Sequence, residues 1–429
     1  MRARFRQWFE DINDSFWFRP SLIVLSAIIL AQFLIDLDHD AIGVPDFVAR
    51  WLYSGGETGA RTLLGAVAGS TIGVAGTVFS ITIATLTLAS TQMGPRLLRN
   101  FTRDRGNQIT LGIYVGTFAY TLIVLRSIRG VDQGAFIPGM AITGAILLAL
   151  LCVAMLIYFV NHVTAQINFD NVINLVYQDL RSRLEKVTAD TNPPARLPDD
   201  HWKDGIPVFH EGGGYLQQLD EDLIADWAAK NNVQIMLDMR VGNYVFPGVH
   251  VAMVTRGTAD ASDILARAMA LGPYPTPSGD LEYAVEQLVD IAMRALSSGI
   301  NDPRTAARVL DRLGSILCVL ATRRLPTGAI ARNDVIVFQR TVTTYDGLID
   351  AMFHTIRQSA RNTPSVLIHM MDTLLRVMEC EQDQNRRASI LRHAELIHLD
   401  GKRDIPSAND RAALAERFEA VGRMALSSK

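Results

Sequence analysis

The sequence predicts an α-helical membrane protein with four transmembrane helices and both termini in the cytoplasm, followed by a C-terminal α+β cytoplasmic region. Three observations support this fold class. Four long apolar segments lie before residue 161 of the 429-residue chain, whereas the rest has the composition of a soluble domain. Arginines alternate in number between the loops that join these segments. Short strand patterns and then amphipathic helix patterns follow the last segment.

Changes in composition divide the chain into five parts. Residues 1–19 form an interfacial amphipathic helix, residues 20–165 the transmembrane domain, and residues 166–200 a connecting helix and linker. Residues 201–280 form a small β-barrel-like subdomain, and residues 281–429 form a helical subdomain. The linker is marked by three prolines between residues 193 and 198, which a helix cannot accommodate.

The first 19 residues have the pattern of a helix that lies flat in the membrane interface. Phe5, Trp8, Phe9, Ile12 and Phe16 recur at helical spacing, while arginines and acids occupy the other faces. An ordinary amphipathic helix packed on protein has the same pattern and remains the alternative.

Residues 21–37, 62–90, 107–125 and 136–160 are the predicted membrane spans. The N-terminal segment and the second loop carry four arginines each, whereas the first and third loops carry two each. Because cytoplasmic loops are enriched in arginine and lysine, this alternation places both termini in the cytoplasm. No Asp, Glu, Lys, Arg or His lies deep inside any span, which argues against proton-coupled transport and against intramembrane proteases of the paired-aspartate or HExxH kind.

The second span, residues 62–90, is filled with small and hydroxyl-bearing residues. One helical stripe, at alternating steps of three and four, consists of Ser70, Gly73, Thr77, Ser80, Ala84, Thr87 and Thr91. Gly65, Gly69 and Gly73 form two overlapping GxxxG motifs on a neighbouring stripe, and Gly76 adds a further glycine for close helix packing.

Two interpretations of these stripes stay open. In the first, the glycines admit a neighbouring helix and each hydroxyl bonds to a carbonyl of its own helix. In the second, the hydroxyl stripe lines a water-filled axis between several copies of the chain, and the glycines pack between copies. One helix has room for both arrangements.

A basic block follows the second span. Arg96, Arg99 and Arg103 share one helical face, and Arg105 lies close behind them. Such a block sets membrane orientation and contacts anionic lipid headgroups. In an oligomer the same arginines would form a ring at the inner mouth of a pore and concentrate anions there.

The soluble region offers little chemistry. Its histidines are scattered, the three cysteines are far apart in sequence, and GxSxG, P-loop and GxGxxG motifs are absent. Residues 241–248 resemble the turn of lipoyl-type barrel domains, but no lysine occupies the hairpin tip. We therefore predict no enzymatic activity, no cofactor and no metal site. A net charge of −3 also argues against nucleic-acid binding.

One corner in the soluble region is well defined by its sequence. Gly299 can end one helix, Asn301 or Asp302 can cap the next, and Pro303 fits its first turn. We assign this corner a structural role.

Together, residues 76–108 and the run at 295–303 resemble the DUF2254 family, a group of bacterial predicted membrane proteins with a domain of unknown function. Residues 214–220 and 241–247 fit the same family in the expected order, although Arg304 is more basic than the family pattern. The resemblance implies a protein of the bacterial inner membrane that has four membrane spans and a cytoplasmic domain. It implies no activity.

The leading hypothesis is a homo-oligomeric ion channel or small-solute pore in the bacterial inner membrane, lined by the second span. Its partners would be the lipid bilayer, other copies of the chain, and ions or small solutes. The alternative is a non-conducting membrane-anchored scaffold or sensor whose cytoplasmic domain binds a partner or ligand.

Overall fold

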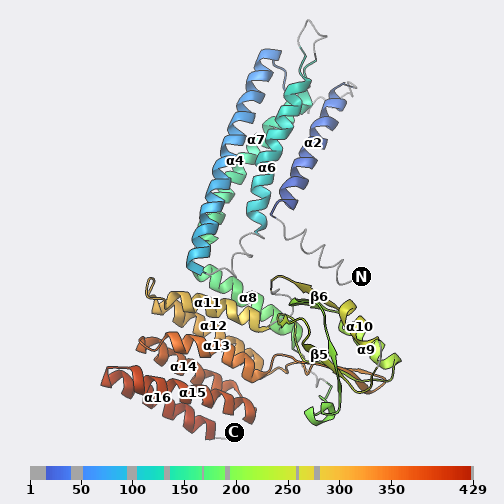
Figure 1. Cartoon of the computed structure of the whole chain (residues 1–429). Coiled ribbons are helices and arrows are strands. Elements are labelled where there is room, and N and C mark those ends of the chain that lie inside the picture. Colours follow the sequence, from blue (N-terminus) through green and yellow to red (C-terminus); the bar gives the residue numbers. More distant parts are fainter. Residues whose placement is uncertain are drawn as a thin grey trace. The chain divides into compact units, whose positions relative to one another are not determined.

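A computed structural model describes residues 16–39, 52–93, 104–129, 136–166, 169–188, 194–257, 260–274 and 281–426. The chain divides into an N-terminal unit, Trp8–Asn171, and a C-terminal unit that begins at Val172. Each unit is treated by itself below (Figure 1). The interfacial helix predicted for residues 1–19 lies almost entirely outside the described residues.

Among its described residues, the N-terminal unit has four helices that are long and apolar enough to cross a membrane, as predicted (Figure 1). They are α2 (Phe18–His39), α4 (Glu57–Met93), α6 (Arg105–Ser127) and α7 (Gly139–Gln166). Helix α6 contacts the other three and is the central helix. In the most apolar 18-residue stretch of α6, 56% of the residues are buried, compared with 11% to 22% in the corresponding stretches of the other three helices.

Polar and small residues explain the central position of α6. The Tyr114 hydroxyl donates to the carbonyl of Cys152 and the Tyr120 hydroxyl to that of Ala141, each at 2.7 Å, so both tyrosines join α6 to α7. A Cβ at Gly112 would lie 2.7 Å from Cδ1 of Ile23, because α2 approaches the α6 backbone closely there. Interhelical hydrogen bonds and glycine contacts are the main sources of helix association inside a membrane.

Acidic side chains cap two of these helices. Asp38, at the end of α2, accepts hydrogen bonds from the backbone N–H groups of Met140 and Ala141 in the first turn of α7, at 3.1 and 3.0 Å. Asp104 is the N-cap of α6. These carboxylates satisfy N–H groups that have no partner within their own helix.

The C-terminal unit begins within α8 (Phe169–Val187) and continues into a β-rich part and a helical part. The β-rich part contains a 3-10 helix (Asp199–Trp202), β1 (Ile206–Phe209), β2 (Gly214–Leu219), α9 (Glu221–Lys230), β3 (Ile235–Leu237), β4 (Tyr244–Val245), β5 (His250–Val254), α10 (Ala261–Ala268) and β6 (Met269–Gly272). The remainder consists of α11 (Leu281–Ala295), α12 (Pro303–Ala321), β7 (Ala329–Arg332), β8 (Val335–Arg340), α13 (Tyr345–Ser359), α14 (Pro364–Cys380), α15 (Gln384–Asp404) and α16 (Ala408–Leu426).

The strands form two open sheets, so the prediction of a barrel-like subdomain was wrong. The five-stranded sheet has the order β1-β5-β3-β8-β7, and the three-stranded sheet has the order β4-β2-β6. Strand β8 pairs with β3 in parallel, with Phe338 opposite Ile235. Two of the five strands therefore come from beyond residue 281. The larger sheet ends in two separate edges, β1 and β7, instead of closing on itself.

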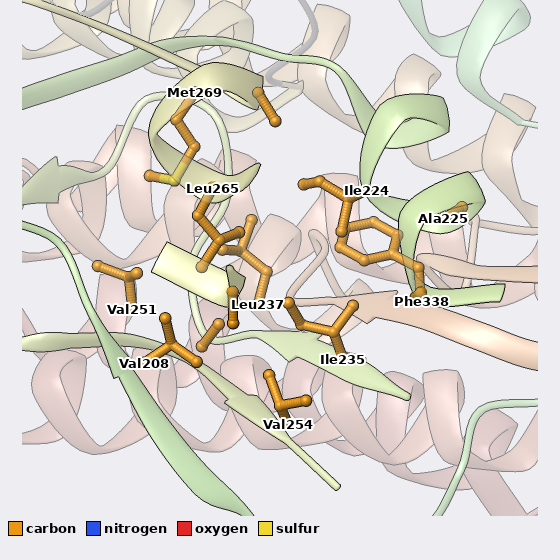
Figure 2. Packing of buried hydrophobic residues seen from close by; sticks show 14 of the residues in the cluster. Val208, Ile224, Ala225, Ile235, Leu237, Val251, Val254, Leu265, Met269 and Phe338 are labelled. Carbon is orange, nitrogen blue, oxygen red and sulfur yellow. The ribbon is translucent and has the colours of Figure 1, made fainter. Parts of the chain in front are cut away.

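A hydrophobic core holds the five-stranded sheet against α9 and α10 (Figure 2). Ile235, Leu237 and Ala252 of the sheet are fully buried, as are Ile224 of α9 and Leu265 of α10. Alternation along each strand places these side chains on one face of the sheet, where the two amphipathic helices cover them.

In the helical part, each helix packs against the helix two places further along the chain. Contacts join α12 to α14 and α14 to α16 in one row, and α11 to α13 and α13 to α15 in the other. Two adjacent arginines of α15 bind helix ends: Arg386 donates to the carbonyls of Leu320 and Arg323, and Arg387 to those of Met378 and Glu381. Cations at helix C-termini satisfy free carbonyls and stabilise the helix dipole.

Candidate functional site

Helix α4 has one covered face and one open face. The covered face packs on α6 and α7 and consists of small or apolar residues, mostly at steps of three and four: Ala60, Leu64, Ala68, Thr71, Ala75, Val78 and Thr85. At about 100° per residue, this set lies on the side of the helix opposite the hydroxyl stripe. The spans of this chain therefore leave the hydroxyl stripe uncovered.

The open face carries both stripes that the sequence marked. The described side chains of the hydroxyl stripe, at 70, 73, 77, 80, 84 and 87, are all exposed. A Cβ added at Gly65, Gly69, Gly73 or Gly76 would meet nothing within 4 Å. The neighbour that the GxxxG pattern predicts is thus not among the described helices of this chain.

The hydroxyls of the open face bond to their own helix. Thr77, Ser80 and Thr87 each donate to the carbonyl four residues earlier, at 3.2, 2.9 and 2.9 Å. Ser70 donates to the carbonyl of Val67 at 3.1 Å. Each hydroxyl proton is used inside the helix, so the oxygen lone pairs point outward as hydrogen-bond acceptors.

The basic block lies mainly outside the described residues. Arg96, Arg99 and Arg103 fall in the undescribed range 94–103, and the side chain of Thr91 is also not described. Arg105 is the exposed first residue of α6. The ring of arginines at an inner mouth therefore stays a prediction.

A polar cluster that sequence reasoning missed joins the start of α6 to the end of α7. The Asp104 carboxylate accepts from the N–H groups of Gly106 and Asn107, at 3.0 and 3.4 Å, and lies 2.8 Å from Nε2 of His162. The His162 ring stacks on Tyr158 at 5.2 Å between centroids. The sequence did show Asp104 and His162 just outside two spans, but nothing in their spacing indicates that they meet.

Replacing Gly106 by alanine is expected to open this cluster. The added Cβ would lie 2.6 Å from Nε2 of His162 and 2.8 Å from the Tyr158 hydroxyl, so these two stacked side chains have to move. Such overpacking costs about 1–3 kcal/mol. Thermal unfolding of the full chain in detergent measures the loss. Gly422→Ala is the matched control, because a Cβ at this helical glycine meets nothing within 4 Å. Equal melting temperatures of Gly106→Ala and Gly422→Ala would contradict the expected clash.

The predicted corner at residues 299–303 joins α11 to α12. Asp302 caps α12 by accepting from the N–H groups of Arg304 and Thr305 and from the Thr305 hydroxyl, at 3.1, 3.2 and 2.6 Å. Pro303 begins the helix. Asn301 adopts a left-handed backbone with φ 50°, a conformation that asparagine tolerates better than most residues. Gly299 is exposed and a Cβ there would meet nothing.

Asp302→Ala is expected to destabilise the C-terminal unit by about 0.5–2 kcal/mol, the usual effect of losing an N-cap. The Thr305 hydroxyl, together with two backbone N–H groups, lowers the pKa of Asp302. Its stabilising contribution is therefore complete above the unfolded pKa of about 3.9 and is lost as pH falls further through the folded pKa. Melting curves of wild type and variant at pH 7 and pH 3 check this. If the difference in melting temperature between wild type and Asp302→Ala is the same at pH 7 and pH 3, the charge of Asp302 does not contribute to the cap. Asp302→Asn should retain most of the stability.

Two hollows in the C-terminal unit have little chemistry to offer. The larger, about 250 Å³, lies beside β1 and is lined mainly by apolar residues from Ile206 to Ala261. The smaller, about 110 Å³, contains two arginines that are already paired, Arg240 with Glu282 and Arg340 with Glu221. Among the described residues, no three His, Cys, Asp or Glu side chains converge as a metal site requires. The open face of α4 is therefore the candidate site.

Comparison with known proteins assigns the chain to a protein family. The family model described as Predicted membrane protein (DUF2254) matches residues 13–376, which includes all four apolar helices and most of the C-terminal unit. The chain belongs to the DUF2254 family. This agrees with the resemblance noted in the sequence, and it establishes a membrane protein of unknown function.

Two similar mycobacterial proteins are described only as uncharacterised. An uncharacterised protein of Mycobacterium tuberculosis (strain CDC 1551 / Oshkosh) is 32% identical over 392 residues, covering 88% of this chain and 75% of the relative. An uncharacterised protein of Mycobacterium bovis (strain ATCC BAA-935 / AF2122/97) matches with the same identity and coverage. No solved structure gives a significant match.

Proposed function

We propose that this DUF2254 protein forms a homo-oligomer in the bacterial inner membrane, in which the open face of α4 surrounds a passive pore for ions or small solutes. The observation that supports this proposal is the exposure of an uncharged face of glycine and hydroxyl residues along a membrane helix. Water or another polar surface is a better neighbour for such a face than lipid.

The exposed surface of α7 differs in composition from the open face of α4, and in the proposed oligomer it would face lipid. Most of its exposed residues are large and apolar, for example Leu147, Leu150 and Ile157, with exposed fractions of 62%, 61% and 70%. Bulky side chains of this kind suit contact with acyl chains, whereas small residues allow backbones of two helices to approach closely. The glycines of α4 would pack between copies, and the hydroxyl stripe would face the axis.

The chemistry of the open face would determine which ions the proposed pore prefers. Hydroxyl oxygens whose protons are bonded to the helix present acceptors, which suit a hydrated cation. The arginines at 96, 99, 103 and 105 would act in the opposite direction by concentrating anions at the inner mouth. Ion preference would therefore be decided at the mouth, and neutralising these arginines would move the pore toward cations.

The arginine alternation gives the proposed orientation. Both termini would lie in the cytoplasm, and so would the basic block and the C-terminal unit. The C-terminal unit, with its sheet and rows of helices, would then serve assembly and regulation on the cytoplasmic side.

A non-conducting scaffold or sensor is the second candidate. The observation in its favour is that Thr77, Ser80 and Thr87 all satisfy their protons inside α4, as a dry and tightly packed helix interface requires. In that case the C-terminal unit would bind a partner or ligand, and the spans would only anchor and associate.

Reconstitution separates the two candidates. The purified full chain is incorporated into planar bilayers for current recording, and its oligomeric state is measured by native mass spectrometry from nanodiscs. An oligomer with discrete conductance steps supports the pore. An oligomer without conductance favours the scaffold, and a monomer without conductance overturns both roles proposed for the open face.

A further inference from the structure

An exposed aromatic patch lies on the β-rich part of the C-terminal unit. It consists of Tyr244, Phe246, Val249 and Tyr274, with exposed fractions of 44%, 62%, 49% and 66%. The ring centroids of Tyr244 and Phe246 are 5.0 Å apart, and Tyr244 also contacts the half-buried ring of Tyr215 at 5.1 Å. Exposed apolar groups that lie next to one another mark interaction surfaces.

Backbone contacts bring the parts of this aromatic patch together. Strand β2 lies between β4, which carries Tyr244, and β6, which leads to Tyr274. The amide of Gln217 in β2 donates to the carbonyl of Tyr274 at 2.7 Å. Gly248 has φ +78° and donates to the carbonyl of His210 at 3.2 Å, which fixes the turn between Phe246 and Val249. The patch is therefore a structured surface held by two turns and a sheet.

The segment that supplies most of the patch carries almost no charge. Between residues 241 and 255 there is no Asp, Glu, Lys or Arg, and His250 is the one titratable side chain apart from Tyr244. Glu211 and His210 lie on the neighbouring turn. A partner is thus selected by apolar and aromatic contact rather than by a charge pattern.

The size of the patch decides between a second copy and a lipid surface. Its three exposed rings offer on the order of 350 Å² if each has a full area of about 200 Å². A stable protein interface needs roughly 800 Å² per partner, so the patch is too small to hold a dimer. Tyrosine is enriched where a protein meets the headgroup layer, because its ring is apolar while its hydroxyl stays hydrated, and phenylalanine is one of the apolar residues that interfacial helices bury there.

We infer that the aromatic patch inserts into the headgroup layer of a lipid bilayer. Residues 167–205 join the last membrane helix to β1, so the patch is covalently tethered to a bilayer and needs no high affinity of its own. The β-rich part then has a membrane contact in addition to the spans. This inference does not depend on whether the protein conducts.

Spin-label accessibility in the full chain tests the inference. Single cysteines are introduced by Phe246→Cys or Val249→Cys in a background that lacks Cys152, Cys318 and Cys380, and the labelled protein is placed in phosphatidylcholine–phosphatidylglycerol vesicles. Collision with oxygen, which concentrates in lipid, is compared with collision with a water-soluble nickel chelate. Val335→Cys is the matched control, because this valine of β8 is exposed to a similar extent, 54% against 49% for Val249.

The oxygen-to-nickel ratio is expected to be several-fold higher at positions 246 and 249 than at 335. Adding Tyr244→Asp to the Val249→Cys chain should lower the ratio at 249 to the control value, since a charge opposes insertion. Equal ratios at 249 and 335 in the original chain would overturn the inference. A label at 249 that is shielded from both reagents would also overturn it, because the patch would then be covered by protein, such as a second copy or residues 1–15.

Discussion

Replacing both Thr77 and Ser80 by leucine is expected to abolish conductance of the reconstituted protein while leaving its oligomeric state intact. Both side chains are exposed on the open face of α4, so leucine causes no clash within the chain. Around a shared axis, however, the substitution exchanges two rings of hydroxyl oxygens for branched apolar groups. A hydrophobic constriction of this kind excludes water and closes a pore.

Ile72→Thr is the matched control for this prediction. Ile72 lies on α4 with an exposed fraction of 43%, on the flank of the helix that borders the glycine stripe and about a quarter turn or more from Thr77 and Ser80. Changing its polarity should leave single-channel conductance unchanged. If the double leucine variant conducts like the wild type, then α4 does not line the pathway, and the pore proposal loses its central element.

Replacing Asp400 by asparagine is expected to destabilise the C-terminal unit by about 3–5 kcal/mol, the usual effect of leaving a buried charge without its partner. Asp400 of α15 pairs with Arg357 of α13, and their side chains are only 8% and 7% exposed. Arg403 and Arg361 also approach Asp400, at 2.9 and 4.0 Å. Without the carboxylate, the buried Arg357 guanidinium would lose its buried counter-charge and would lie near two further arginines, Arg361 and Arg403. Burial already lowers the pKa of Arg357, and Arg361 and Arg403 lower it further.

The two partners of this pair should differ in effect. Arg357→Met leaves Asp400 paired with Arg403, so it should cost clearly less than Asp400→Asn. The double variant Arg357→Met/Asp400→Leu removes both charges and should recover most of the stability. Thermal unfolding of the full chain in detergent, monitored by circular dichroism, ranks the stability losses of the three variants. Equal losses for the two single variants would show that Asp400 has no special role among these arginines.

Local patterns in the sequence were sufficient for the four apolar helices and for the Asp302 cap of α12. Apolar length alone placed α4, predicted at 62–90 and observed at Glu57–Met93. The corner before α12 was equally accessible, because Asp302 and Pro303 act on backbone groups within three residues of themselves.

Pairings between distant residues could not be predicted in this way. The barrel prediction failed because strand alternation shows which residues face a core but not which strand lies beside which. The central role of α6 was missed for a similar reason. Its tyrosines and threonines are ambiguous until their partners on α7 are known. Likewise, the stripes on α4 were visible in the sequence, but only the packing of α6 and α7 shows that they are on the open side.

The parallel pairing of β8 with β3 has a consequence for how the protein is made. Ile235 leaves the ribosome long before its neighbour Phe338, and α11 and α12 are synthesised in between. During that interval one side of β3 has no strand to pair with. Contacts between such distant residues form slowly and expose strand edges to aggregation. The sheet is therefore completed late in synthesis, and a chain that stops before residue 335 lacks the strand that joins β3 to β7.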